Sequence, residues 1–356
     1  MKTSFNPLSN KISLIVVITV AWVLVALLDF FGAYGVLLQY NCELEDVNPW
    51  VPFGTSLMIG LLAGTIGGST MVFSWGGWLR SKTYGRALVD IWWSYTLIYL
   101  FVSSLSGFYF YSRQAEGPFV WQDVAMILFN PQQIRNYLYW LGIMLITMIF
   151  LQVNDKYGPG NFRALLFGKY FRPRREERIF MFLDLRSSTT IAEKLGERRY
   201  FNFINDVFKS VTPSILRFLG EIYQYVGDEI VITWKMRSGD QRGNCVQCFF
   251  HAQKALQAKR DYFEKEYGVV PQFKAGLHFG YVMAGEIGIV KRDISFSGDV
   301  LNTTSRIQDK CNELGVDILL SKPLVDRLDL PYSIEPREIG EMALKGKEEK
   351  VTLVTV

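Results

Sequence analysis

The sequence predicts two structural parts, an α-helical transmembrane domain of four helices and a second domain of mixed α+β structure. Charge and tryptophan distribution support this division. Of the 38 Lys and Arg residues and 34 Asp and Glu residues, only 7 of each group lie in residues 1–152. Eight of the nine tryptophans also precede residue 178. A segment so poor in charge suits the interior of a bilayer, whereas the remainder has the charge content of a water-exposed domain.

Four apolar stretches in the first part are candidates for membrane spans. Ile12–Leu28 is a run of 17 residues, all apolar except Ser13 and Thr19, and its helix is expected to continue to about residue 40. Such a run is near the lower limit for crossing a hydrocarbon core about 30 Å thick. It is too long for a cleaved signal peptide, and no small-residue cleavage site follows it. The predicted domain covers residues 1–153, with helices at about 12–40, 53–79, 88–110 and 137–153.

The loops between these stretches predict the orientation of the chain. With both termini inside, the inner segments carry twelve Lys and Arg residues, whereas the outer segments carry only Arg113 and Arg135. Inner loops of membrane proteins are enriched in basic residues. We therefore expect a multi-pass protein of the cell membrane, anchored in the lipid bilayer, with both termini and the second domain in the cytoplasm.

Small residues mark one face of the second predicted span. Gly60, Gly64 and Gly68 follow one another at intervals of four residues. This spacing allows two helix backbones to approach closely. Packing within the four-helix bundle and packing against a second copy of the chain are both consistent with it.

Residues 154–177 are predicted to be a basic linker between the two domains. Gly158, Pro159 and Gly160 interrupt the helix that leaves the membrane, and a cluster of basic residues follows. Such a cluster can lie against anionic lipid headgroups. The segment is either a simple spacer or an element that couples the membrane domain to the domain after it.

From residue 178 the pattern changes to short strands and amphipathic helices. Gly227-Asp228 stands between two apolar runs and indicates a β-hairpin. Strands are expected at 179–185, 221–226, 230–234, 271–279, 316–320, 333–339 and 351–356, and helices at 189–195, 199–219, 240–266 and 299–314. This α+β domain of residues 178–356 is large enough for a substantial core.

Two aspartates stand where predicted strands end or turn. Asp184 closes the first strand of the domain, and Asp228 lies in the hairpin turn. Carboxylates at neighbouring strand ends can converge on hard divalent cations, as phosphoryl transfer requires. Gly-Asp turns are common and most are structural, so the two aspartates alone leave both interpretations open.

Five sequence blocks in a fixed order are more specific than the aspartates alone. They are FLDLRSST, YVGDEIVI, AGLHFGYVMAGEIG, SGDVLNTTSRI and ALKGK. Together they resemble the catalytic domain of class III nucleotidyl cyclases, the adenylyl and guanylyl cyclases, in their membrane-anchored bacterial form. The resemblance covers residues 178–356. It implies a ferredoxin-like α+β fold and a phosphorus–oxygen lyase activity, adenylate cyclase in the first place.

The resemblance implies a metal site. Asp184 and Asp228 match the two metal-binding aspartates, and the backbone carbonyl of Leu185 matches a third ligand. These groups would hold two divalent cations, Mg2+ or Mn2+, which activate the ribose 3′-hydroxyl and neutralise phosphate charge.

It also implies a set of catalytic and phosphate-binding residues. Asn302 and Arg306 match the pair that stabilises the transition state, and their i, i+4 spacing places both on one helix face. Arg306 would meet the charge that develops at the α-phosphate, and Asn302 would orient the ribose. Lys345 matches a lysine that contacts the terminal phosphates.

The sequence departs from the family where the nucleobase is recognised. Adenylyl cyclases usually carry Lys at the position of Gln224 and Asp or Thr at the position of Ser295, whereas guanylyl cyclases carry Glu and Cys. An amide and a hydroxyl can each donate and accept a hydrogen bond, so both purines remain possible. Ser295 carries a hydroxyl group like the threonine of some adenylyl cyclases, and this similarity favours ATP as the substrate.

The family implies a homodimer with sites between two catalytic domains. One chain would supply Asp184 and Asp228 and the other Gln224, Ser295, Asn302, Arg306 and Lys345. The rival interpretation is a catalytically silent receptor module that keeps the fold for dimerisation. A net charge of +4 gives no support to nucleic-acid binding.

Overall fold

The computed structural model describes residues 7–39, 49–75, 82–114, 130–157, 168–290, 292–344 and 350–356. The chain divides into two compact units, Leu8–Arg163 and Ala164–Val356. Each unit has its own hydrophobic core. The α-helical and α+β parts predicted from the sequence are therefore confirmed.

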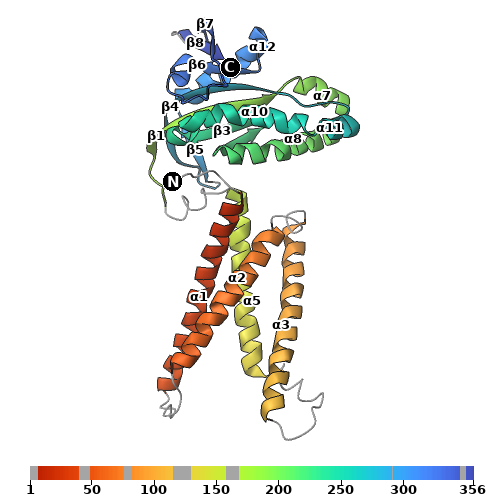
Figure 1. Cartoon of the computed structure of the whole chain (residues 1–356), viewed down its shortest axis with the longest axis vertical. Helices are drawn as coiled ribbons and strands as arrows, with labels where there is room; N and C mark the ends of the chain where they lie inside the picture. The colour runs from red at the N-terminus through yellow and green to blue at the C-terminus, as the bar shows by residue number, and fades with distance from the viewer. Residues whose placement is uncertain are drawn as a thin grey trace. The chain divides into compact units, whose positions relative to one another are not determined.

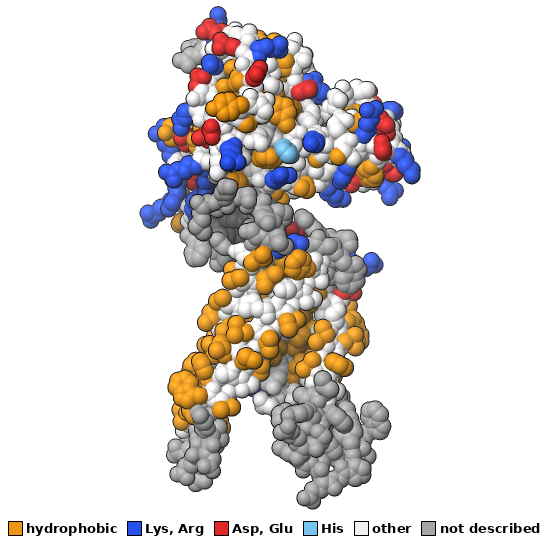
Figure 2. All heavy atoms as spheres, in the orientation of Figure 1, with side chains coloured by type: hydrophobic (Ala, Val, Ile, Leu, Met, Phe, Trp, Pro, Cys, Tyr) orange, Lys and Arg blue, Asp and Glu red, His pale blue; other side chains and the backbone are white. Residues whose placement is uncertain are grey.

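The first unit is built from long helices (Figure 1). They are α1 (Pro7–Gln39), α2 (Trp50–Trp75), α3 (Tyr84–Gln114) and α5 (Pro131–Tyr157). Among the described residues, four helices are long and apolar enough to cross a membrane. In the view of Figure 2, apolar side chains cover much of the described surface of this unit, whereas Lys, Arg, Asp and Glu side chains are frequent on the other unit. The four helices predicted from hydropathy are confirmed, and all four begin earlier than predicted.

The glycines of α2 pack against α1 of the same chain. A Cβ atom at Gly64 would lie 2.7 Å from the Cα of Thr19, and one at Gly60 would lie 2.8 Å from the Cα of Val23. Both distances are shorter than a side chain tolerates, so only glycine allows this approach. Of the two alternatives left open by the sequence, packing within the bundle accounts for this face.

The second unit contains one eight-stranded sheet. Its strands are β1 (Arg174–Leu185), β2 (Glu221–Val226), β3 (Glu229–Lys235), β4 (Phe273–Ile287), β5 (Asp293–Ser297), β6 (Ile318–Ser321), β7 (Arg337–Ala343) and β8 (Lys350–Thr355). Their order is β2-β3-β1-β4-β6-β8-β7, and β5 forms a hairpin with β4. The central strands β1, β3 and β4 pair antiparallel, whereas β6 joins β4 in parallel.

The two faces of the sheet are covered differently. The helices of this unit are α7 (Ser188–Leu195), α8 (Glu197–Arg217), α9 (Met236–Asp240), α10 (Asn244–Gln257), α11 (Arg260–Tyr267), α12 (Asp299–Leu314) and α13 (Lys322–Val325). Ile179, Met181 and Leu183 of β1 face the core formed with α8 and α10. Alternate side chains of a strand point to opposite faces, and Phe180 accordingly packs in a separate cluster with Phe296 of β5. Asp184 belongs to this second face.

The pairing of β1 with β4 is longer than predicted. Strand β1 begins at Arg174, inside the range assigned to the linker, and β4 runs to Ile287 instead of ending at Phe279. The extra residues pair with each other, since Arg174 stands opposite Ala284. Gly280 and Gly285 lie in this extension, and their lack of a side chain accommodates Val300 and Pro173. Strand β5, which pairs with the extension, was not predicted.

Two further boundaries differ from the prediction. The helix expected at 240–266 is interrupted at Arg242, where φ is +54°, and again before α11, which begins at Arg260. Its apolar periodicity continues across both breaks, so periodicity alone did not reveal them. Strand β7 starts at Arg337 and not at residue 333.

Candidate active site

Asp184 is held at the end of β1 by partners from two other elements. It stands opposite Lys274 of β4, whose Nζ lies 3.2 Å from Asp184 Oδ2. Gln308 of α12 donates a hydrogen bond of 2.9 Å from Nε2 to the same oxygen. These contacts fix one carboxylate oxygen and thereby the orientation of the group. Leu185, the next residue, is buried and ends the strand.

The hairpin turn brings Asp228 to the same end of the sheet. Val226 pairs with Glu229, so Gly227 and Asp228 form a two-residue turn, and Gly227 has φ +61°. Glycine adopts this conformation without strain at the first position of such turns. Strand β3 then pairs with β1 up to Leu183, one residue before Asp184. The structure therefore places both predicted metal-binding aspartates at adjoining strand ends.

The carboxylates interact electrostatically. Burial raises the pKa of Asp184, and Asp228 raises it further, whereas the hydrogen bond from Lys274 opposes this shift. Burial raises the pKa of Glu229 to about 7, with further contributions from Asp184 and Asp228. Like charges at close range make ionisation costly unless a cation is present.

These groups have the chemistry of a divalent-cation site. Carboxylate and carbonyl oxygens are the donors that Mg2+ and Mn2+ prefer. In the described part of the chain, no group of three His, Cys, Asp or Glu side chains is arranged to hold a metal ion. The two aspartates and the Leu185 carbonyl, the set expected from the sequence, offer oxygen donors of the type that such an ion binds.

Asn302 and Arg306 lie on the other side of α12 from Gln308. Thr304, Ile307 and Gln308 are buried, whereas Asn302 is exposed and Arg306 is half-buried. Two residues along a helix differ by about 200° in direction, so Arg306 points away from Gln308. Within one chain, Arg306 therefore lies on the side of α12 that faces away from Asp184.

A β-bulge determines the direction of Gln224. In the β2–β3 ladder Ile222 pairs with Ile232 and Gln224 pairs with Val231, which leaves Tyr223 as an extra residue. Val231 packs on the same sheet face as Phe180. A bulge turns the following side chain to the opposite face from the one that simple alternation would give. Gln224 therefore faces the side of the sheet that also carries Asp184.

Tyr223 connects Gln224 to Ser295. Its ring packs against Phe296 with 5.0 Å between centroids, and its hydroxyl accepts a 3.3 Å hydrogen bond from the Phe296 backbone N–H. The same hydroxyl lies 3.4 Å from Ser295 Oγ. The two predicted base-binding residues, Gln224 and Ser295, are therefore the sequence neighbours of Tyr223 and Phe296, which join β2 to β5. Lys345 lies outside the described residues, directly after the buried Leu344.

Four residues of this region were not identified from the sequence. Lys274 and Gln308 reach Asp184 from distant segments, and no local pattern marks them. The position of Tyr223 depends on the β-bulge, which no sequence pattern indicated. Glu229 did have a signal, because it directly follows Asp228 and must point toward the same strand end.

Comparison with known proteins identifies the family of the second unit. The family model for the adenylate and guanylate cyclase catalytic domain matches residues 172–355, more than half of the chain. The chain belongs to this cyclase family. Adenylate cyclase 2 of Rhizobium meliloti (strain 1021) is 35% identical over 206 residues, which are 58% of this chain and 57% of that protein.

Other relatives extend this comparison. An adenylate cyclase of Anabaena cylindrica is 28% identical over 186 residues, covering 49% of this chain and 36% of that protein. A bacterial light-regulated adenylyl cyclase structure superposes with a TM-score of 0.52 at 20% identity, over 61% of this chain and 63% of that chain. This likeness concerns the cyclase fold. The chain spans less than two thirds of the length of each of these proteins.

Proposed function

We propose that the chain is a membrane-anchored adenylate cyclase that converts ATP to 3′,5′-cyclic AMP and pyrophosphate for intracellular signalling. Membership of the cyclase family and the 35% identity to an adenylate cyclase support this activity. The observation that carries the proposal is the pair Asp184 and Asp228 at adjoining strand ends, beside a helix that bears Asn302 and Arg306. In-line attack of the ribose 3′-oxygen on the α-phosphorus gives the products.

The residues divide the work of the reaction. Asp184, Asp228 and the Leu185 carbonyl would hold two divalent cations, Mg2+ or Mn2+, which would supply charge neutralisation and activation of the 3′-hydroxyl. Arg306 stabilises the charge that develops on the α-phosphate, and Asn302 orients the ribose.

Substrate recognition involves a further set of residues. Lys345 contacts the terminal phosphates, and Gln224 and Ser295 contact the base. Gln308 and Lys274 hold the Asp184 carboxylate in place through the contacts to its Oδ2.

The complete site requires two copies of the chain. Arg306 and Asn302 point away from the buried side of α12, where Gln308 meets Asp184, so they are directed away from the aspartate of their own chain. Large exposed apolar side chains on β2 and β4, such as Val226, Tyr281 and Met283, suit an interface. We infer a homodimer with two equivalent sites.

The helical unit anchors the enzyme in the lipid bilayer. Four described helices of sufficient length and hydropathy support a multi-pass arrangement. The excess of basic residues on one side of these helices supports cytoplasmic termini and a cytoplasmic catalytic domain, where nucleotide triphosphates are available. Cysteine accessibility on each side of a sealed vesicle tests this orientation.

Product analysis tests the proposed activity. Detergent-purified full-length protein is incubated separately with ATP, GTP, CTP and UTP, with Mn2+ and with Mg2+, and products are identified by mass spectrometry. We expect cyclic AMP from the wild type and none from the Asp228→Asn variant. The absence of every cyclic product from a verified dimer would instead identify a silent receptor module.

Guanylate cyclase activity is the second candidate. The observation that favours it is the pair Gln224 and Ser295, which lacks the lysine typical of adenylate recognition. The Gln224 amide can accept from N1 of guanine as readily as it can donate to N1 of adenine. Cyclic GMP formed from GTP in the assay above, with little cyclic AMP formed from ATP, would establish this alternative.

A further inference from the structure

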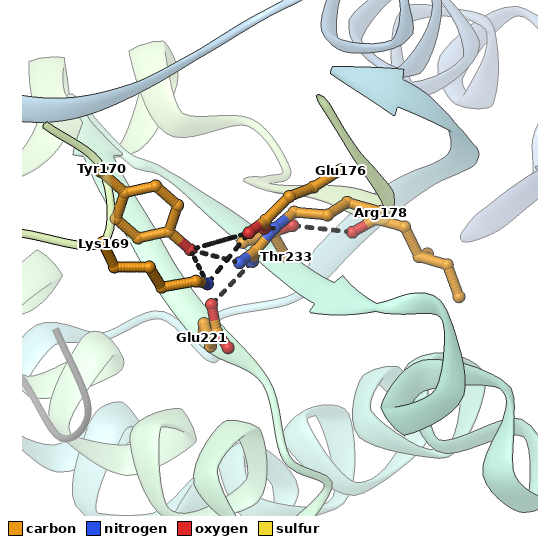
Figure 3. A network of polar contacts seen from close by, with 7 residues as sticks. Lys169, Tyr170, Glu176, Arg178, Glu221 and Thr233 are labelled. Carbon is orange, nitrogen blue, oxygen red and sulfur yellow. Dashed lines mark hydrogen bonds and ion pairs between the residues drawn. The ribbon is translucent and has the colours of Figure 1, made fainter. Parts of the chain in front are cut away.

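A buried arginine lies at the centre of a polar cluster at the other end of the sheet from Asp184. We name the Arg178 cluster by its members Lys169, Tyr170, Glu176, Arg178 and Glu221. Figure 3 shows their side chains directed toward one another. The side chain of Arg178 is only 1% exposed. An arginine so deeply buried is tolerated only when its donors are satisfied by charged or polar partners.

The partners of Arg178 come from three segments. Its Nε donates to Glu176 at 2.8 Å, one terminal nitrogen donates to Glu221 at 2.7 Å, and the other donates to the Tyr170 hydroxyl at 3.2 Å. Lys169 adds a contact of 2.9 Å to Glu176. The cluster therefore ties β1 and β2 to the first described residues after the membrane helices.

The same arginine contacts the strand that carries Ser295. Its guanidinium lies 4.5 Å from the centroid of the Phe296 ring, a cation–π distance. Phe296 follows Ser295 directly, and its backbone N–H donates a hydrogen bond to the Tyr223 hydroxyl. On the other side, Glu221 begins β2, which carries the bulge at Tyr223 and Gln224.

Arg178 thus touches both elements that present the base-binding residues. Through Glu221 it fixes the start of β2, and through Phe296 it fixes β5. The backbone of Tyr170 adds a further anchor, since its carbonyl accepts from the N–H of Glu286 in β4, the strand paired with β5. The 168–170 segment is therefore connected to β2 through Arg178 and Glu221, and to β5 through Arg178 and through β4.

We propose that the Arg178 cluster is a positioning device that sets the spacing between Gln224 and Ser295. Nucleobase selection then depends on contacts made by the segment that leads from the membrane helices. This inference rests on the proposed function, because it assigns the base to these two residues. Arg178 acts through β2 and β5 and contacts no substrate.

Two variants weaken the cluster without removing bulk. Glu221→Gln keeps the shape of the side chain but removes the charge opposite Arg178. Tyr170→Phe removes the hydroxyl group and keeps the buried ring, so it is the milder change. Glu264→Gln is the matched control, because Glu264 forms an exposed ion pair with Arg260 on α11, away from the cluster.

The primary readout is binding, measured by calorimetry with 3′-deoxy-ATP and 3′-deoxy-GTP, which lack the attacking hydroxyl. For Glu221→Gln we expect the Kd of the preferred analogue to rise roughly fivefold, the effect of one weakened hydrogen bond. The Kd of the other analogue changes less, so the selectivity ratio moves toward one. Tyr170→Phe shifts the ratio in the same direction, and Glu264→Gln leaves it unchanged.

The proposal would be overturned if Glu221→Gln and Tyr170→Phe raised the Kd of both analogues by the same factor, or left the selectivity ratio unchanged. The cluster would then be a purely structural element. Melting temperatures measured in parallel identify loss of folding, in which case Tyr170→Phe decides the matter. Because these analogues bind without turnover, the ratio is measured even if the wild type forms no cyclic product. The latter result would refute the proposed function alone.

Discussion

Replacing Gly276 by alanine is expected to displace the helix that carries the catalytic pair. Gly276 lies in β4 directly beneath α12. A Cβ atom there would lie 2.4 Å from the backbone N of Gln308 and 2.7 Å from the carbonyl oxygen of Thr304. Ordinary contacts of a Cβ atom begin at 3.4 Å, so the helix must move by about 1 Å. Backbone atoms cannot rotate away as a flexible side chain would.

The displacement has an energetic and a catalytic consequence. Overpacking of a well-packed site costs about 1–3 kcal/mol of unfolding free energy, and a backbone clash belongs at the upper end. A misplacement of about 1 Å lowers catalytic rates by roughly 10²-fold. The shift also lengthens the bond between Gln308 and Asp184.

The assay combines thermal unfolding with kcat in the same detergent preparation. Gly85→Ala is the control, since a Cβ atom at Gly85 in α3 meets nothing within 4 Å. We expect Gly276→Ala to lower both the melting temperature and kcat, and Gly85→Ala to change neither. If Gly276→Ala kept the wild-type melting temperature and kcat, close packing of α12 on β4 would not be what positions Arg306.

Three further predictions concern individual site residues. Arg306→Ala should lower kcat by roughly 10²–10³-fold with little change in the melting temperature; wild-type kcat would remove Arg306 from the transition state. Gln224→Lys should raise the ratio of kcat/KM for ATP over GTP, whereas an unchanged ratio would show that Gln224 does not contact the base. The raised pKa of Glu229 means that the metal-free folded state binds more protons than the unfolded state between about pH 4.5 and 7. Stability in EDTA should therefore fall as pH rises through this window, and Glu229→Gln should flatten the fall in melting temperature; an identical pH profile would contradict the assigned environment.

The local features of the site could be predicted from the sequence, but the contacts between distant segments could not. Asp184 follows an apolar run and Asp228 follows a glycine, so each aspartate carries its own signal of a strand end or turn. Lys274 and Gln308 carry no such signal, because their role depends on the pairing of β1 with β4 and on the packing of α12. Pairing partners are set by the tertiary fold and not by periodicity.

The bulge at Tyr223 shows a second limit of sequence patterns. Strict alternation along β2 would direct Gln224 toward the helical core, whereas the extra residue directs it to the opposite face. Nothing in the composition of 221–226 announces this change of register. The buried Arg178 illustrates the same point, because an arginine is rarely buried without paired charges, and here its partners come from tertiary contacts.

Complementation tests the shared active site most directly. Asp228→Ala and Arg306→Ala chains, each expected to be inactive alone, are co-expressed and purified together through different tags. A dimer of the two contains one site with both damaged residues and one site with neither. The account predicts that cyclic nucleotide formation is recovered. Each mixed dimer should reach up to about half the activity of a wild-type dimer, because one of its two sites is intact. No recovery in a verified mixed dimer would contradict a site built from two chains.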